Sequence, residues 1–352
     1  MIEYRRAAAE DYPRIVEFHK RVDGKTRTYD DFLWEFSKGP FGASIYIVAV
    51  DGERIVGTNC VIPVEVLDDR GQRILTGKSE DTLVDPEYRG RNIFYDLYQV
   101  LFAECEKEGI QAIWGYIPAI KPFRKLGFDI PFHHSQSIVV FKILPSFRYL
   151  NGKNAENSFL TKAKIFALCV MSRLKFSTRS KKSTLKIVDS DSIKPFMELC
   201  NDFGNYPPNS FAIHHTQDYF NWRYTENPNL KGLRNLVCKD EQNDVVAAVV
   251  LNITAENICY ISHLAFKSGL RFKARKAVLV AMTVHLKRQG VAAVRNWHFR
   301  TNPYNEEEIK LYEESAFTIL DRGIAFVWKD LTQSQLDPNR FLLSRASTQG
   351  LW

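Results

Sequence analysis

The stretch DPEYRGRNIF, residues 85–94, stands between an apolar segment ending in Leu83-Val84 and a long helical pattern. Pro86 has no N–H group to donate, so it interrupts strand pairing. The stretch is therefore predicted to be a strand-to-helix turn. The first turn of a helix leaves backbone N–H groups unpaired and carries the positive end of the helix dipole, which makes it a ready anion site.

Gly90 permits positive φ and close backbone approach, and Arg89 and Arg91 pair well with phosphate oxygens. Asn92 tolerates positive φ better than most residues, so it can stand in for a second glycine. A pyrophosphate would fit such a turn. The alternative is a helix N-cap with solvated arginines. Neither GxxxxGK[ST] nor GxGxxG after a first strand is present, so ATP and NAD lose their main sequence support.

Around this turn, apolar periodicity predicts strands and helices in the order β-α-α-β-β-β-α-β-α-β, ending in a strand pair between Phe128 and Phe141. From TLKIVD onward the second half repeats that order without obvious identity, closing with strands in AFTILDRGIAFVWKD. A repeat with a period of about 170 residues suggests a duplicated domain.

With RRAAAEDYPRIVEF and RIVGTNCVIP before it and FRKLGF after it, the turn resembles the acetyl-CoA loop of the GCN5-related N-acetyltransferase (GNAT) superfamily. Tyr88, Arg89 and Gly90 match the tyrosine-arginine-glycine core of that loop, and Asn92 replaces its last glycine. The resemblance covers residues 1 to about 142. The corresponding second-half loop, AFKSGLRFKARKA, keeps Gly269 but lacks the core, so we do not expect it to bind CoA.

The resemblance implies an α/β fold with a mixed sheet. We expect two tandem GNAT-like domains, each with a mostly antiparallel central sheet flanked by helices. The predicted division is an acetyl-CoA-binding domain at 1–147, a basic helical linker at 148–182 and a degenerate domain at 183–352 that shapes the acceptor site. FNWRYTENP is similar to a pattern in two-domain acetyltransferase-like proteins of bacterial surface-polysaccharide clusters.

The formal charge of +7 in 352 residues is concentrated in one segment, Lys153 to Lys182, which has eight basic residues and one acidic residue. Such confinement, without an RNP-like or helix-turn-helix signature, argues against nucleic-acid binding. The segment is either an interfacial helix attracted to anionic lipid or, as we favour, a linker helix with solvated charges.

The six cysteines are scattered without a CxxC pair, and the chain begins MIEYRRAAAEDY without a secretory pattern. We therefore expect reduced thiols and a cytoplasmic location. No apolar run approaches the roughly 20 residues of a transmembrane helix. His133-His134 and His214-His215 are adjacent pairs whose side chains point apart on a strand, so no metal site is expected.

The resemblance further implies direct transfer, in which an amine attacks the thioester of bound acetyl-CoA while a base removes a proton. It assigns the cofactor to the end of the strand before the loop and to the loop itself. The expected cofactor-binding residues are Leu83, Val84, Arg89, Gly90, Arg91, Asn92, Ile93 and Phe94.

Glu80 and Asp81 stand where many family members carry a carboxylate, and strand alternation lets only one of them face the cleft. We slightly favour Asp81 as the base, although either could be an exposed strand-end charge. The family's usual tyrosine acid is replaced by Phe123. Tyr312 occupies the matching position in the second half, as a catalytic acid or as a half-buried helix tyrosine.

Aromatic faces and a guanidinium suit sugars and phosphates, so the acceptor is expected to contact some of these groups. The candidates are Trp222, Arg223 and Tyr224, then Trp297 beside His298 and Arg300, and Tyr116 where the family's asparagine is missing. The alternative is that the Trp222 cluster pins a helix to the core.

The sequence thus predicts an acetyl-CoA-dependent N-acetyltransferase, a monomer or homodimer acting on a small-molecule amine. The acceptor would be an amino sugar or its nucleotide-linked form, or else a small amine such as an antibiotic, or a peptide amine. The rival hypothesis is a non-catalytic acyl-CoA-binding or scaffold protein, motivated by Phe123 and the missing asparagine.

Overall fold

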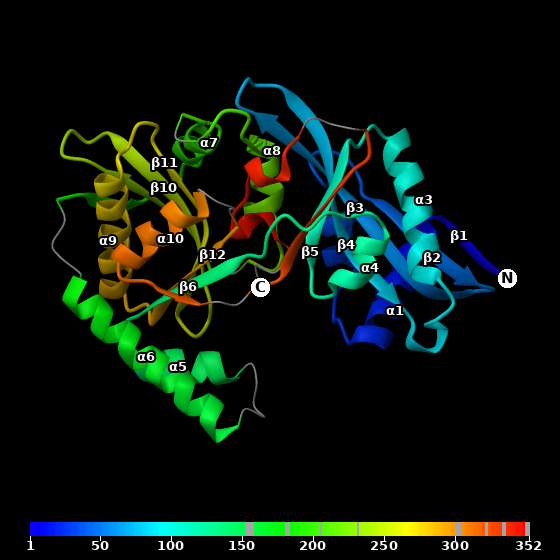
Figure 1. The fold of residues 1–352 in the computed structure, drawn as a ribbon, viewed down its shortest axis with the longest axis horizontal. Coiled ribbons are helices and arrows are strands. Elements are labelled where there is room, and N and C mark those ends of the chain that lie inside the picture. The colour runs from blue at the N-terminus through cyan, green and yellow to red at the C-terminus, as the bar shows by residue number, and fades with distance from the viewer. Residues whose placement is uncertain are drawn as a thin grey trace. The chain divides into compact units, whose positions relative to one another are not determined.

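In the computed structural model the chain forms two compact units built from interleaved segments. The structure describes residues 1–152, 158–179, 184–204, 206–230, 232–299, 304–320, 323–332 and 336–348 (Figure 1). The first unit comprises Met1–Phe132, Phe211–Pro228 and Ile324–Pro338, and the second comprises His133–Ser210, Asn229–Gly323 and Asn339–Trp352.

The sheet of the first unit has the strand order β1-β2-β3-β4-β5-β14, with β8 pairing with β3. All neighbours are antiparallel except β4 and β5. The strands are β1 (Ile2–Arg6), β2 (Ile45–Asp51), β3 (Arg54–Asp68), β4 (Arg73–Val84), β5 (Ala112–Ile117), β8 (Phe211–Ile213) and β14 (Ala325–Asp330). The helices are α1 (Tyr12–Asp23), α2 (Tyr29–Phe36), α3 (Ile93–Lys107), α4 (Ile120–Lys125) and α8 (Gln217–Phe220).

Strand alternation assigns these helices to the two faces of the sheet. On β2, Ile47 joins the apolar cluster that includes α3 and α4. Its neighbour Tyr46 instead contacts Phe32 and Phe36 of α2, at ring-centroid distances of 5.5 and 5.3 Å. The two faces of the sheet are therefore covered by α3 with α4 and by α2, respectively.

The sheet of the second unit has the order β13-β6-β12-β11-β10-β9-β7, and only β11 and β12 are parallel. The strands are β6 (Ser135–Val140), β7 (Lys186–Asp189), β9 (Leu233–Lys239), β10 (Val245–Ile253), β11 (Ile258–Phe266), β12 (Ala293–His298) and β13 (Thr318–Leu320). The helices are α5 (Ile143–Gly152), α6 (Phe159–Arg179), α7 (Lys194–Cys200), α9 (Phe272–Arg288) and α10 (Tyr304–Glu314). Two mostly antiparallel sheets flanked by helices confirm the predicted fold class.

The two halves of the chain exchange a strand. β14, from the end of the chain, completes the first sheet beside β5, and β6, from the first half, takes the corresponding place beside β12 in the second sheet. The strand pair predicted between Phe128 and Phe141 is not formed, because β6 pairs with β12 and β13 instead. Continuous domains at 1–147 and 183–352 accordingly coincide with neither compact unit.

The basic segment belongs to the second unit. Its described part forms α6, which contacts α5 and β6. Within the described ranges, no helix is long and apolar enough to cross a membrane.

Candidate active site

The first sheet opens between its two parallel strands. β4 and β5 pair only at Gly77 with Ile113 and at Lys78 with Trp114, although β4 continues to Val84 and β5 to Ile117. Beyond this short pairing the strands separate, so backbone N–H and C=O groups along the opening are left for another partner. The predicted cofactor residues Leu83 and Val84 lie, half-buried, in this part of β4.

A β-bulge breaks the alternation of β4 within the opening. Asp81 has a φ of 52°, and the register with β3 shifts beside it. The hydroxyl of Tyr98 on α3 lies 3.0 Å from the Ser79 hydroxyl and 3.2 Å from that of Thr82, although strict alternation would turn these two residues to opposite faces. The bulge therefore places Glu80 and Asp81 together on the other face, and the expectation that only one of them could face the cleft is wrong.

Asp81 is a buried carboxylate surrounded by cations. It accepts hydrogen bonds from Lys25 Nζ at 2.8 Å, from Arg27 at 2.7 and 3.1 Å, and from the Tyr46 hydroxyl at 2.8 Å. Burial by itself would raise the pKa of Asp81, but His19, Arg27 and Lys25 hold this pKa well below its usual range. A carboxylate so strongly stabilised as an anion is a poor proton acceptor.

Glu80 is the more accessible carboxylate, with a side chain that is 25% exposed. Glu80 pairs with the ammonium group of Lys78. Burial lowers the pKa of Lys78, and the negative charge of Glu80 opposes this shift. Nearby, burial raises the pKa of Glu35 on α2 to about 7, although Arg27, 3.1 Å away, acts against it. Glu80, Glu35 and Lys78 were not singled out together from the sequence, because α2 and β4 are far apart along the chain.

Tyr116 on β5 stands across the opening from these groups. Burial, followed by the charge of Glu80, raises the pKa of Tyr116 well above its ordinary value, so its phenol is neutral. Phe123 packs in an aromatic cluster with Phe94 and Tyr98, at centroid distances of 5.6 Å each. Tyr98 on α3 therefore packs beside the position where the family's acid is missing, and burial raises its pKa to about 12.

The loop after β4 has the backbone expected of an anion site. Gly90 and Asn92 have φ values of 83° and 61°, so the prediction that Asn92 replaces glycine in a left-handed conformation is confirmed. Asn92 is the N-cap of α3. Residues 89–92 are exposed, and in the described part of the chain the N–H groups of Gly90 to Ile93 donate no hydrogen bond. Ile93 is buried in the core and Phe94 is half-buried.

Asp85 fixes the start of this loop. Its side chain accepts from the Glu87 N–H at 3.1 Å and pairs with Arg21 and Arg54, each at 2.9 Å. Although burial opposes the shift, these bonds hold the pKa of Asp85 below its usual value. Arg91 lies over the ring of Tyr88 at 4.7 Å. The loop is therefore held by ion pairs at its base, while its glycine and backbone donors face solvent.

The cluster around Trp222 belongs to the same unit, but it fixes this segment to α2 and does not line the opening between β4 and β5. Trp222 stacks on Trp34 of α2 at 5.5 Å, and each indole N–H donates to the other residue's carbonyl at 2.8 Å. Tyr224 is 1% exposed and packs against Phe220. Burial lowers the pKa of Arg223, while the charges of Glu35 and Glu80 act in the opposite direction. Arg223 is therefore the predicted acceptor residue of this segment that interacts electrostatically with these two carboxylates.

The remaining candidates lie in the second unit. Tyr312 is 3% exposed in the core, with its ring 4.7 Å from His298 and 4.9 Å from Phe317. Trp297 is half-buried, and its ring lies 4.6 Å from that of His134. Arg300 lies outside the described residues. The burial of Tyr312 supports the alternative of a structural helix tyrosine.

The second sheet repeats the opening and the bulge. β11 and β12 pair only from Ile258 with Ala293 to Tyr260 with Arg295, and the register of β11 shifts farther along. However, a short turn at Arg345–Ser347 contacts both strands. The Arg345 guanidinium lies 3.7 Å from the centre of the Tyr260 ring and is buried. The chain itself thus covers this second opening, in agreement with the missing loop core.

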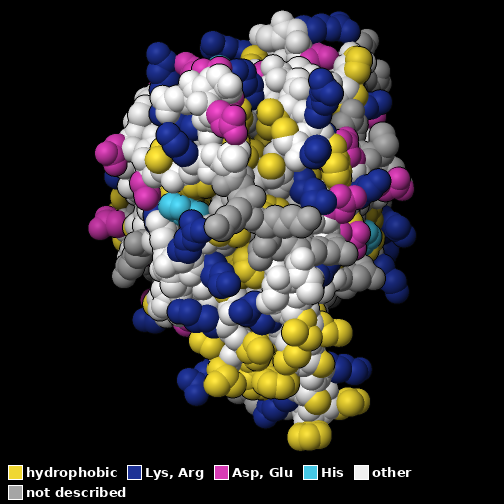
Figure 2. Space-filling model, turned by 90° about the vertical axis from the view of Figure 1, so that its left-hand side faces the viewer, with side chains coloured by type: hydrophobic (Ala, Val, Ile, Leu, Met, Phe, Trp, Pro, Cys, Tyr) yellow, Lys and Arg dark blue, Asp and Glu magenta, His cyan; other side chains and the backbone are white. Residues whose placement is uncertain are grey.

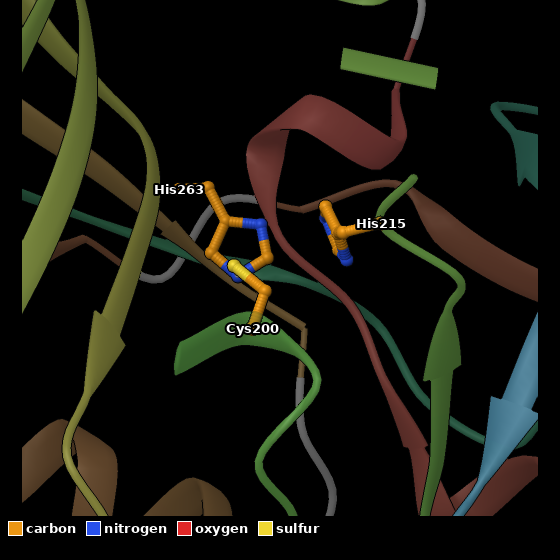
Figure 3. A group of neighbouring side chains, drawn as sticks. All are labelled: Cys200, His215 and His263. Atoms are coloured by element: carbon orange, nitrogen blue, oxygen red, sulfur yellow. The ribbon is translucent and has the colours of Figure 1, made fainter. Parts of the chain in front are cut away.

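Cys200 of α7 and His263 of β11 adjoin each other in the second unit, with Sγ 3.5 Å from Nε2 (Figure 3). The third labelled side chain, His215, belongs to the first unit. Burial raises the pKa of the Cys200 thiol well above its ordinary value.

Residues 3–130 match the protein family described as an acetyltransferase (GNAT) domain. This region is a GNAT domain. The match contains β4, its bulge, the exposed loop and β5, and it excludes the Trp222 segment and β14, which complete the unit in space. The GNAT match assigns the first unit to a class of domains that transfer acyl groups from CoA thioesters.

Solved structures extend the likeness over both units. A conserved protein from Enterococcus faecalis V583, described as a probable N-acyltransferase, has 12% identity and a TM-score of 0.65, covering 94% of this chain and 73% of the other. Saccharomyces cerevisiae N-myristoyltransferase with bound myristoyl-CoA has 12% identity and a TM-score of 0.58, covering 93% and 82%.

A glucosamine N-acetyltransferase region in a fungal multi-domain β-N-acetylglucosaminidase has 13% identity and a TM-score of 0.58, covering 94% of this chain and 38% of that one. At such identities the likeness shows the tandem GNAT fold alone. No curated protein matches the sequence.

Proposed function

We propose that the GNAT domain transfers an acetyl group from acetyl-CoA to an amine acceptor. The observation that carries the proposal is the continuous geometry from the β4–β5 opening to the loop at Gly90. Backbone groups of β4 that face the opening suit the pantetheine amides, and the exposed N–H groups before α3 suit the pyrophosphate.

In this proposal Leu83 and Val84 hold the pantetheine arm through backbone groups. Arg89, Gly90, Arg91 and Asn92, with the N-terminus of α3 at Ile93 and Phe94, hold the phosphates. Glu80 accepts the proton from the attacking amine, since Asp81 is committed to its ion pairs. As nitrogen bonds to the acetyl carbon, the thioester C–S bond breaks and CoA leaves as the thiolate.

Tyr98 is proposed as the group that stabilises this leaving thiolate. Its neutral phenol lies among the Ser79 and Thr82 hydroxyls on the α3 face of the bulge. A neutral donor with a raised pKa can hydrogen-bond the sulfur without first losing its proton. It would thereby take over the role that Phe123 cannot perform.

For the acceptor we propose an amino sugar or a nucleotide-linked amino sugar in a cytoplasmic setting. The cluster pattern in FNWRYTENP and the glucosamine N-acetyltransferase region among the similar folds support this class. Tyr116 and Arg223 are the contacts proposed in the first unit. Small amines and peptide amines are the alternative acceptors.

Two measurements test the proposal. Millimolar CoA or acetyl-CoA should raise the thermal unfolding midpoint, because ligands that bind the native state stabilise it. Thiol release from acetyl-CoA should then appear with glucosamine or its nucleotide-linked form within a panel of amines. An unchanged midpoint rejects the cofactor. A raised midpoint with no thiol release for any amine favours the non-catalytic acyl-CoA-binding alternative.

Donor chain length is decided by the same assays. One similar fold holds myristoyl-CoA, so acetyl-, octanoyl- and myristoyl-CoA should be compared directly. The acetyl proposal requires the highest kcat/KM for acetyl-CoA.

A further inference from the structure

The exposed large apolar side chains of the described residues concentrate on the α5–α6 hairpin of the second unit. They form a continuous apolar surface on that hairpin in the space-filling view (Figure 2). Its members, with exposed fractions, are Leu144 (59%), Phe159 (88%), Leu160 (63%), Phe166 (43%), Met171 (59%) and Leu174 (60%). An exposed patch of this kind marks an interaction surface more often than an ordinary monomer face.

The patch is not simply the core-facing side of α6 left uncovered. That side is a separate stripe at helical spacing, formed by Ile165, Cys169, Ser172 and Phe176, all buried. Ser172 fixes it to β6, accepting from the Val140 N–H at 3.1 Å. α6 therefore satisfies the core with one face and carries a second apolar face toward solvent.

Basic residues flank the exposed face on both sides. At about 100° per residue, Lys162 and Arg173 lie about 60–80° from Ile165 in one direction, and Lys164 lies about 100° in the other. Measured from Ile165 in the first direction, the exposed Leu174 lies at about 180° and the exposed Met171 at about 240°, so both lie between the two basic flanks. Neither α5 nor α6 contains an acidic residue. An apolar face bordered by cations is the pattern of a helix lying in a membrane interface.

We propose that the α5–α6 hairpin docks on the surface of an anionic lipid bilayer, with the Phe159–Leu174 face in the headgroup region and its basic flanks on lipid phosphates. A second copy of the chain fits less well, because two such faces would bring like charges together. The helix lies along the surface rather than across it, in keeping with the absence of a spanning helix among the described residues. The proposal is independent of the acyl-transfer chemistry.

Vesicle flotation tests this directly with the full chain. Vesicles of phosphatidylcholine containing 30% phosphatidylglycerol, about one lipid in three, should bind the protein at least tenfold more strongly than phosphatidylcholine alone. The difference should shrink as salt is raised. Equal or absent binding to both vesicle types overturns the proposal.

The triple variant Phe159→Ser, Leu160→Ser and Met171→Ser should lose at least tenfold in vesicle affinity. Val188→Ser is the matched control, since Val188 is an exposed apolar residue of β7, 40% exposed and outside the hairpin, and should bind like the parent. An unchanged triple variant places the binding elsewhere and rejects the hairpin.

A tryptophan within the exposed apolar face gives a second readout. Met171→Trp should show shorter-wavelength emission and quenching by brominated lipid on anionic vesicles, relative to the parent protein. If the face instead binds another copy, the triple variant will abolish self-association in sedimentation while vesicle binding is absent, and the lipid proposal fails.

Discussion

At the scale of single residues, two neighbouring carboxylates on β4 have different surroundings, which suit them to different roles. Asp81 has three hydrogen-bonding partners with tightly fixed positions, whereas Glu80 is partly exposed beside Lys78. The sequence pointed to both residues but favoured Asp81 as the base. The ion pairs of Asp81 with Lys25 and Arg27 join residues more than fifty positions apart, so the sequence near Asp81 gives no sign of them.

Glu80→Gln is expected to lower turnover by about 10²-fold or more while leaving acetyl-CoA affinity unchanged, since loss of a general base acts on the chemical step. Calorimetric titration and thiol release would measure the two quantities separately. Because the substitution leaves Lys78 without its partner, the double variant Lys78→Met/Glu80→Gln serves as a stability control. Full activity in either variant removes Glu80 from the mechanism.

Asp81→Asn should act mainly on stability. Removing one member of a buried ion-pair cluster leaves the others uncompensated and is expected to lower the free energy of unfolding by about 3–5 kcal/mol. Urea unfolding would measure the loss. A stable Asp81→Asn variant with little turnover would return Asp81 to the role of base.

Glu35 gives a pH dependence of known sign. Its folded-state pKa of about 7 exceeds the ordinary 4.5, so the folded state binds the proton more tightly than the unfolded state. The corresponding stability is present below about pH 4.5 and is lost as pH rises to about 7, amounting to about 3 kcal/mol. Glu35→Gln should flatten the decline in unfolding free energy between pH 5 and 8. Parallel curves for parent and variant would contradict this.

At the scale of elements, the strand-loop-helix unit of β4 and α3 was the best predicted part of the molecule. Its turn, positive φ at Gly90 and cap at Asn92 are set by residues adjacent in sequence. The bulge at Asp81 was missed, because Glu80-Asp81-Thr82 reads as an ordinary alternating strand and the shift arises from pairing with β3.

Gly90→Glu is expected to abolish CoA binding without unfolding the domain, since a Cβ at Gly90 meets no atom within 4 Å. The positive φ of 83° should reduce stability by about 1 kcal/mol, and the added negative charge should repel phosphate. Thermal shifts with and without CoA would show both effects. Gly71→Glu, at a turn with a φ of 81° outside the loop, is the matched control and should keep CoA binding.

Trp222→Ala should destabilise the first unit by about 3–5 kcal/mol, through loss of the stacked ring and of its hydrogen bond to Trp34. Urea unfolding would measure this as a lower midpoint. A variant lacking Trp222 but as stable as the parent would support an acceptor role for Trp222.

Tyr312→Phe, by contrast, should leave turnover unchanged, because the ring of Tyr312 is enclosed in the core of the second unit.

At the scale of the whole molecule, apolar periodicity predicted two similar domains but not which strand completes which sheet. β6 and β14 occupy corresponding places, so either could in principle have paired within its own half. Which sheet each of these strands joins depends on long-range packing, such as the stacking of the Phe326 ring on the Phe132 ring at 4.7 Å. The residue pattern within a single strand therefore does not predict which sheet the strand joins.

A fragment of residues 1–147 is therefore expected to fail to fold cooperatively. It lacks β14, which covers the β5 edge, and the Trp222 segment that stacks on Trp34. Circular dichroism on heating should show a broad transition, whereas the full chain should show a sharp one. A sharp transition and CoA binding by the fragment would establish 1–147 as an autonomous domain.

The exchanged strand also determines when, during synthesis, the first sheet can be completed. The last residue of β5 is Ile117, but its neighbour β14 ends at Asp330. At ribosomal rates the intervening chain takes roughly 10–40 s to appear. Through that interval the nascent first sheet has a bare edge, which must be shielded from other nascent chains. Formation of the proposed cofactor site is thus expected to wait until β14 has been synthesised, long after β4 and β5.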